Sequence, residues 1–246
     1  MTQSSSSLSI SGIVSSERGF SLVELMVAMV IGLIVVLVVG TLFMNSRQTY
    51  MAQDANSRLQ ENARYATELF GRQVRTAGYV AVNFSPLSGA NLFAKPASFT
   101  FVGKAIQGVG ADSITLSYEG EKDCLGQVAA TPIKQINLFR VNASSQLECA
   151  AGGNTGVILD DVEAMQVWYR EKNKTTYEVA SAVNMDNVSS VRICVLLRAR
   201  ADGAQRAVEL GVNQVYVDCS GASVTKSDGY IRRAMTTTVA LRNRMP

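Results

Sequence analysis

Six residues near the N-terminus combine a possible cleavage junction with a charge in an apolar setting. They read Gly19-Phe20-Ser21-Leu22-Val23-Glu24, and Glu24 is the only ionisable side chain from Phe20 to Met44. The segment from Phe20 to Met44 is otherwise apolar, and a charged residue inside an apolar membrane-spanning segment costs roughly 2.5–3.5 kcal/mol on membrane-insertion scales. A cut between Gly19 and Phe20 would explain why Glu24 is tolerated there, because the new ammonium on Phe20 lies four residues before the carboxylate. In a packed assembly, the carboxylate could pair with the terminal ammonium of a neighbouring chain.

These residues need a helix that starts beside them and continues into a bilayer. The segment from Phe20 to Met44 is apolar, and a run of about 20 such residues can span a bilayer as a helix. A secretory signal peptide does not fit, since its apolar core has only about 7–15 residues and ends at a small-residue cleavage site. A plain membrane anchor fits the length but leaves Glu24 and the Gly19–Phe20 junction unexplained.

The same residues resemble the N-terminal signal of type IV prepilins and type II secretion pseudopilins. The family pattern is Gly, Phe, Ser or Thr, Leu, an aliphatic residue and Glu, followed by an uninterrupted apolar helix, and every position from Gly19 to Glu24 matches. The resemblance implies that an inner-membrane prepilin peptidase cleaves after Gly19 and N-methylates Phe20. It also implies that Glu24 acts in recruitment and register during filament assembly. The leader, 1–19, has little positive charge, so its cytoplasmic location rests on the cleavage motif.

Composition excludes several kinds of chemistry. The chain has 246 residues, a net charge of +3 and no histidine. Ser-His-Asp catalysis, Cys-His catalysis and His-ligated metals are therefore excluded, and we expect no cofactor, no metal and no enzyme activity. A charge balance this mild makes nucleic acid an unfavoured partner. The length allows an anchor helix followed by one globular domain of about 170 residues.

The part of the chain expected to be globular contains four cysteines: Cys124, Cys149, Cys194 and Cys219. None lies in a Cys-x-x-Cys pair, which argues against zinc ribbons and thioredoxin chemistry. Export to the periplasm would place them in an oxidising compartment, where disulfides persist. Three pairings are possible. The sequential pairing, Cys124–Cys149 and Cys194–Cys219, closes two loops of equal separation, and four buried free thiols are the alternative. We find no internal repeat, despite this equal spacing.

After Met44 the sequence becomes amphipathic. Apolar residues recur at three- and four-residue steps, at Leu59, Ala63, Ala66, Phe70, Val74 and Ala77. This periodicity predicts one helix over 20–77, whose first half, 20–44, is the anchor and whose second half, 45–78, packs on the following domain. The remainder, 79–246, is expected to be a β-rich periplasmic domain. The predicted fold class is therefore α+β and pilin-like, with antiparallel strands.

Alternating or continuous apolar runs predict the strands of this domain. They are Ser98–Val102, Ser113–Tyr118, Ile133–Val141, Ser145–Cys149, Val157–Leu159, Glu163–Arg170, Val191–Arg198, Val212–Val217 and Met235–Leu241. The third and fourth should form a hairpin, and Val191–Arg198, the most apolar, should be central. Gly, Pro and Asn predict loops at Phe84–Pro96 and Gly103–Ala111.

Further stretches resemble PilW-type minor pilins. They are Glu61–Ala66 and Arg75–Tyr79 at the helix end, Cys124-Leu125-Gly126, and the closing run Arg232–Arg244. The resemblance implies a minor pilin that joins other minor pilins and the major pilin at the inner-membrane assembly platform. Such a complex primes type IV pilus growth, can stay at the pilus tip, and supports piliation, twitching motility or adhesion.

Three other functions remain open at this point. A type II secretion minor pseudopilin shares the N-terminal motif. A DNA-uptake pilin, or contact with anionic lipid, is permitted by the closing arginines Arg232, Arg233, Arg242 and Arg244, although such charges more often guard an edge strand. A membrane-tethered enzyme or binding module would need a catalytic constellation, and none is evident.

Two smaller features could also suggest a site. Asp160-Asp161 could form a carboxylate dyad or a calcium site, but with no further acidic cluster nearby a turn or strand start is the simpler interpretation. Trp168 and Tyr169 are expected to be sheet and core residues rather than ligand contacts.

Overall fold

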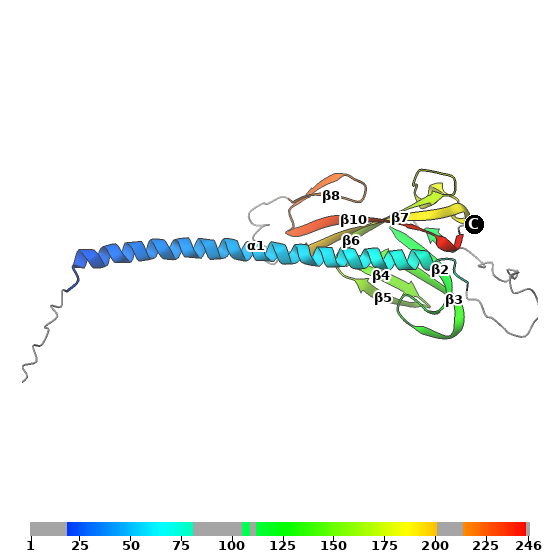
Figure 1. Ribbon diagram of the computed structural model, residues 1–246, viewed down its shortest axis with the longest axis horizontal. Coiled ribbons are helices and arrows are strands. Elements are labelled where there is room, and N and C mark those ends of the chain that lie inside the picture. Colours follow the sequence, from blue (N-terminus) through cyan, green and yellow to red (C-terminus); the bar gives the residue numbers. More distant parts are fainter. Residues whose placement is uncertain (1–18, 81–104, 109–111, 201–213, 245–246) are drawn as a thin grey trace, which may run out of the picture. The chain divides into compact units, whose positions relative to one another are not determined.

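The computed structural model describes residues 19–80, 105–108, 112–200 and 214–244 (Figure 1). The chain divides into two compact units, Met1–Gln48 and Thr49–Pro246. Helix α1, Leu22–Thr76, is continuous and contributes to both units, while the described strands belong to the second. The α+β class predicted from the sequence is confirmed, and α1 differs from the predicted 20–77 by two residues at its start and one at its end.

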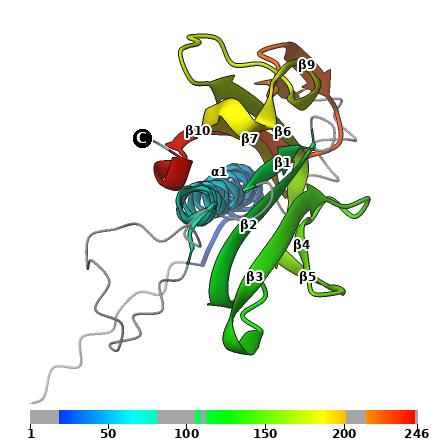
Figure 2. The same cartoon turned by 90° about the vertical axis from the view of Figure 1, so that its right-hand side faces the viewer.

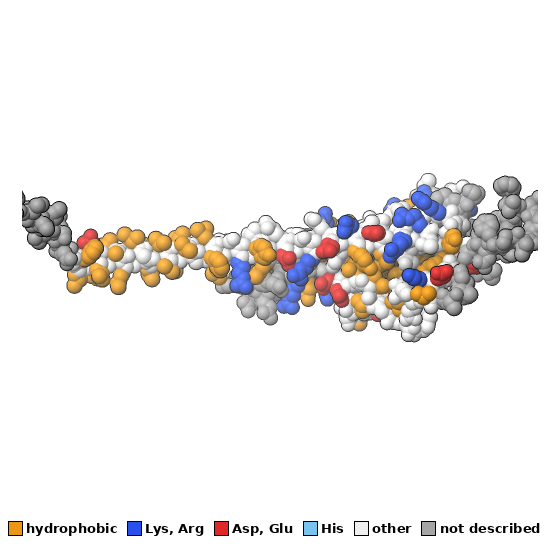
Figure 3. Space-filling model, turned by 60° about the horizontal axis from the view of Figure 1, so that its bottom comes forward, with side chains coloured by type: hydrophobic (Ala, Val, Ile, Leu, Met, Phe, Trp, Pro, Cys, Tyr) orange, Lys and Arg blue, Asp and Glu red, His pale blue; other side chains and the backbone are white. Residues whose placement is uncertain are grey.

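In the first unit, α1 is apolar and exposed. Its side chains from Leu22 to Met44 are exposed, as the apolar surface in Figure 3 shows. This helix is long and apolar enough to cross a membrane. A helix that is hydrophobic on all sides needs either protein or lipid around it.

In the second unit, one face of α1 is buried in the domain core. The six residues of the predicted apolar face are all buried: Leu59, Ala63, Ala66, Phe70, Val74 and Ala77. Phe70 meets Phe139 edge-to-face, with 5.7 Å between ring centroids. Viewed along the helix, strands lie on two sides of this half of α1 (Figure 2).

The described strands form two sheets and a separate hairpin. The first sheet has the order β1-β2-β3-β4-β5, from strands Ile106–Gly108, Ser113–Lys122, Val128–Val141, Leu147–Ala151 and Asn154–Leu159. The second has the order β10-β7-β6, from Tyr230–Ala240, Val188–Arg200 and Val162–Glu171. The hairpin pairs β8, Gln214–Val217, with β9, Ser223–Lys226. Short 3₁₀ turns are η2, Ala180–Ala182, η3, Met185–Asn187, and η4, Arg242–Arg244.

Most of the predicted strands are present, and most of them reach beyond the predicted bounds at one or both ends. The β3–β4 hairpin is confirmed, and the strand predicted at Val191–Arg198 is central as β7. The loop predicted at Gly103–Ala111 is wrong in part, because Ile106–Gly108 pairs with β2 as an edge strand. A three-residue strand is too short to give a period-2 pattern. The predictions at Phe84–Pro96 and Ser98–Val102 lie outside the described residues.

The end of α1 is held by η4, the last turn that the structure describes. Gly78 follows the helix with φ +77°, a conformation that glycine adopts without steric cost. The Asn243 side-chain amide, in η4, donates to the carbonyls of Arg75, Thr76 and Ala77 at 3.1, 3.3 and 3.2 Å. These carbonyls lie at the helix C-terminus, where four lack an intrahelical partner.

Candidate functional site

The N-terminal motif lies at the start of α1, and Ser21 caps the helix. The Ser21 hydroxyl oxygen accepts from the Val23 N–H at 3.2 Å, and its carbonyl accepts from the Leu25 N–H at 3.2 Å. Glu24 lies three residues after this N-cap, which is the spacing of a capping box. This cap was not among the features predicted from the sequence, although the Ser-x-x-Glu pattern could have revealed it.

Gly19 and Phe20 precede the helix and are open to other molecules. Phe20 is 84% exposed, and a Cβ added at Gly19 would meet no described atom within 4 Å. Gly19 also does not adopt a positive φ. Neither packing within the described chain nor backbone conformation therefore demands glycine at position 19.

Glu24 lies in the first turn of α1, among exposed apolar side chains. A carboxylate there is stabilised by the helix dipole, typically by about 0.3–1 kcal/mol. The cost of a charge within a membrane-spanning helix is larger, roughly 2.5–3.5 kcal/mol. The helix dipole therefore offsets only part of the cost of Glu24 in a bilayer.

The cysteines form two disulfides in the sequential pairing, Cys124–Cys149 and Cys194–Cys219. Their Cα atoms lie 6.5 and 5.7 Å apart. The first bridge joins the β2–β3 turn to β4, and the second joins β7 to the β8–β9 turn. Each disulfide therefore links a hairpin turn to a strand that lies outside that hairpin.

The two bridged turns have the same sequence pattern, Asp-Cys-x-Gly-x, at Asp123–Gln127 and Asp218–Ala222. In each, the aspartate Oδ1 accepts from the backbone N–H groups two and four residues later, at 2.8–2.9 Å. The glycines, Gly126 and Gly221, have φ +77° and +85°. No internal repeat is evident from the sequence, because the shared unit is one turn and not a supersecondary element.

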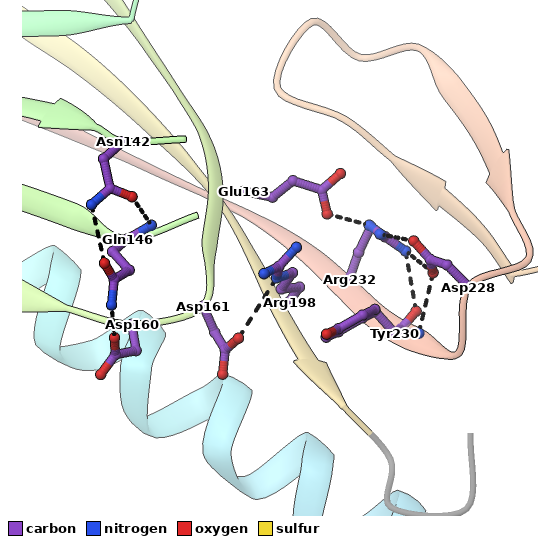
Figure 4. A network of polar contacts seen from close by, with 9 residues as sticks. All are labelled: Asn142, Gln146, Asp160, Asp161, Glu163, Arg198, Asp228, Tyr230 and Arg232. Atoms are coloured by element: carbon purple, nitrogen blue, oxygen red, sulfur yellow. Dashed lines mark hydrogen bonds and ion pairs between the residues drawn. The ribbon is translucent and has the colours of Figure 1, made fainter. Parts of the chain in front are cut away.

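The closing arginines are not equivalent. The Arg232 side chain is only 2% exposed and pairs with Glu163 of β6 at 2.6 Å and with Asp228 (Figure 4). Glu163 also pairs with Lys226 of β9, so this network links the β8–β9 hairpin to the second sheet. Arg233, in contrast, is exposed and lines a groove of about 490 Å³ with Arg64 and Glu68 of α1. Because Arg232 is buried and already paired with two carboxylates, it is not available to bind an anionic ligand.

The Arg232 network also shifts pKa values. The bond from Arg232 lowers the pKa of Asp228 to about 2, below its ordinary 3.8. Burial opposes the charge of Arg232, but its bonds to Asp228 and Glu163 raise its pKa further above the ordinary value. The three groups therefore stay ionised across the physiological pH range.

Asp160 and Asp161 point to different partners (Figure 4). Asp160 accepts from the Gln146 amide at 2.7 Å, and Asp161, with φ +59°, pairs with Arg198 at 3.6 Å. Their divergence does not suit a dyad or a shared cation. Among the described residues, no group of three or more Cys, Asp or Glu could hold a metal ion.

Trp168 and Tyr169 lie on opposite faces of β6. Tyr169 is fully buried, its hydroxyl has no partner among the described groups, and burial raises its pKa. Trp168 is partly exposed and lies opposite Arg192 in the sheet register. The prediction of a core role holds for Tyr169, and Trp168 is a sheet residue.

Family models match two parts of this sequence, and one solved structure is similar to it. A prokaryotic N-terminal methylation motif matches residues 14–40, and a family model for type IV pilus-assembly protein W, PilW, matches residues 128–243. A solved type IV-like pilin from Thermus thermophilus is 15% identical, with a TM-score of 0.45, and the match covers 77% of this chain and 100% of that one. No curated protein gives a significant match.

The N-terminal motif, the long helix and the antiparallel domain define a type IV pilin-like protein. Such a motif implies processing by a prepilin peptidase, anchoring in a membrane and association with other pilins. Within this class, residues 128–243, from β3 into η4, match the family model of the type IV pilus-assembly protein PilW.

Proposed function

We propose that this chain is a minor pilin that helps to prime type IV pilus assembly. The peptidase cuts after Gly19, removes the leader 1–19 and methylates the new amino group of Phe20. Segment 20–44 then anchors the subunit in the inner membrane and later enters the filament core. Segments 45–78 and 79–246 form the periplasmic part, which joins other minor pilins and the major pilin at the assembly platform.

The observation that carries this proposal is the open Gly19–Phe20 junction directly before a capped, exposed apolar helix in a chain with a PilW domain. Glycine is not required there by the described chain, so we infer that the cleft of the peptidase requires it. Ser21 keeps the helix start fixed at Leu22, so that Phe20 and Glu24 hold a constant spacing after cleavage.

We assign to Glu24 the role of pairing with the terminal ammonium of a neighbouring subunit. The helix dipole compensates only part of the cost of its charge, so a second stabilising partner is needed. Together with the two disulfides, which suit an oxidising periplasm, this describes an assembly subunit and not an enzyme. We further propose that this subunit lies at the pilus tip and supports twitching motility or adhesion.

Processing and pilus entry test the proposal together. Mass spectrometry of the wild-type chain should give an N-terminus at N-methylated Phe20, whereas Gly19→Val should leave the leader in place. Non-reducing peptide maps should contain both sequential disulfides. Deletion of the chain should reduce piliation, and immunoblots should detect it in sheared pili. A mature chain that starts elsewhere, or a deletion that impairs type II secretion and leaves piliation intact, would overturn the proposal.

A further inference from the structure

Three arginines surround a hollow at the C-terminal end of α1. Arg72 and Arg75 belong to the last turns of the helix, and Arg242 belongs to η4, which lies beside the helix end (Figure 2). The hollow has a volume of about 290 Å³. Its remaining lining residues are Thr76, Tyr79 and Asn243. All three arginine side chains are exposed, so a molecule that enters the hollow can reach them.

Hydrogen bonds fix the backbone around this hollow. The Asn243 amide donates to the carbonyls at the end of α1, which holds the neighbouring Arg242 beside the helix. On the other side, the Tyr79 carbonyl accepts from the Glu119 N–H of β2 at 2.8 Å. The segments that carry the arginines and Tyr79 are therefore ordered before any ligand binds, and such preorganisation lowers the cost of binding.

The positive charge of the hollow is not neutralised within the described part of the chain. Among the residues that the structure describes, Arg72, Arg75 and Arg242 form no ion pair. A favourable interaction with the helix dipole accounts for the two arginines of α1. The third arginine, from another element, adds like-charge repulsion, and the helix carbonyls already have the Asn243 amide as a donor. A bound anion would relieve this repulsion.

We propose that the hollow binds a sugar that carries a carboxylate. A guanidinium group binds a carboxylate through two parallel N–H···O bonds, so the arginines hold the acidic group. This inference rests on the proposed function, because it gives the adhesive role of the subunit a chemical class of ligand.

The uncharged groups of the hollow suit the rest of such a sugar. Tyr79 is 46% exposed, and its ring offers a flat apolar surface to the C–H face of a sugar ring. The Asn243 amide N–H is used by the helix carbonyls, which leaves its Oδ1 as an acceptor. Sugar hydroxyl groups can donate to this oxygen, and they can also accept from the arginines.

A nucleic acid fits the hollow less well. A phosphodiester group has acceptors only, so it offers no donor to the Asn243 Oδ1. A nucleic acid also carries closely spaced negative charges and needs an extended basic surface. Along α1 such a surface is interrupted, because exposed Glu68 lies one helical turn before Arg72. A single acidic sugar needs only the hollow itself.

Ligand titrations on the purified full-length chain in detergent test the proposal. The carboxylated probes are 3′-sialyllactose and digalacturonate, and lactose is the neutral counterpart of the first. Inorganic phosphate and a short oligothymidylate are the competing anions. We expect at least one carboxylated probe to bind at least tenfold more tightly than lactose, phosphate or the oligonucleotide, as measured by ligand-observed NMR.

Substitutions locate the binding site. Arg72→Gln and Arg242→Gln should each raise the Kd of that probe by about tenfold, because each removes a charge-assisted hydrogen bond. Tyr79→Leu should also weaken binding, whereas Tyr79→Phe should keep most of it, since the ring remains. Arg64→Gln is the matched control, because Arg64 is an exposed arginine of the same helix outside this hollow. It should leave the Kd unchanged.

Several results would overturn the proposal. They are the absence of binding of both carboxylated probes at millimolar concentration, equal binding of lactose, and an equal loss in Arg64→Gln. Phosphate that binds as tightly would indicate an adventitious ion only, and a tighter oligonucleotide would assign the hollow to nucleic acid. In all of these cases cleavage and pilus entry of the wild-type chain stay normal. Failure of the proposed function would instead appear as absent cleavage or absent pilus entry.

Discussion

Asp123 and Asp218 occupy the same position in two equivalent turns, and each directly precedes a disulfide cysteine. Both carboxylates bind backbone N–H groups two and four residues later. A third turn, Asn142–Gln146, uses an asparagine Oδ1 in the same way, with Ser145 at φ +59° in place of the glycine. Short side chains that accept from the backbone in this way favour turns over strands.

The first prediction concerns this turn. Asp123→Ala should lower the free energy of unfolding by about 1 kcal/mol, because two backbone N–H groups lose their acceptor. Asp123→Asn is the matched control and should stay close to wild type, since Asn142 serves the same purpose in the third turn. Urea unfolding under non-reducing conditions measures both. Equal losses in the two variants would show that the carboxylate charge, and not the acceptor geometry, matters.

The second prediction concerns Arg232. Arg232→Met should destabilise the domain by about 3 kcal/mol, because removing one member of a buried ion pair leaves its partners, Glu163 and Asp228, uncompensated. Arg233→Met is the control, and it should change stability little because Arg233 is exposed. Thermal or urea unfolding distinguishes them. If both substitutions have equally small effects, the network does not stabilise the domain.

The third prediction is a pH dependence that arises from Asp228. Its folded pKa of about 2 is below the ordinary 3.8, so the folded state favours the ionised carboxylate. This contribution is present above about pH 4 and is lost as the pH falls towards 2. We expect it to be about 1 kcal/mol, since the side chain is 40% exposed and solvent screens the pair. The stability difference between wild type and Asp228→Asn should therefore shrink over this range. A constant difference would exclude the pKa shift as its cause.

The fourth prediction separates assembly from anchoring at Glu24. If the chain were only tethered, Glu24→Leu should help, because it removes a charge from an apolar segment. For a filament subunit, the same change should leave cleavage largely intact but block pilus entry, since the terminal ammonium of a neighbour loses its partner. Immunoblots of membrane and sheared-pilus fractions, with a piliation assay, measure this. Ser21→Ala is a useful comparison, because it removes the helix cap without removing the charge. Normal piliation with Glu24→Leu would count against the pairing role.

Much of the fold could be predicted because its signals are local. The periodicity of Leu59, Phe70 and Val74 located the buried face of α1, and the apolar run at Val191–Arg198 located the central strand. The Gly19-to-Glu24 motif is contiguous, so a single pass along the sequence can detect it. The helix cap at Ser21 was equally local and could have been found from its spacing.

Other features depend on contacts between distant residues. Glu163 and Arg232 are 69 positions apart, and no periodicity links them. Sequence patterns therefore do not distinguish the closing arginines from one another, although the structure buries Arg232 and leaves Arg233 exposed. Strand β1 was missed because its three residues are recognisable only by their pairing with β2.

The Asn243 amide that closes the end of α1 also fixes an order of events in synthesis. The carbonyls that it binds belong to residues 166–168 positions earlier in the chain. A ribosome therefore adds 166–168 further residues before the helix end can gain this partner. Until then the carbonyls of Arg75, Thr76 and Ala77 lack this donor. The C-terminus of α1 is therefore completed only when η4 folds against it, and a chain clipped before Asn243 would lose this contact.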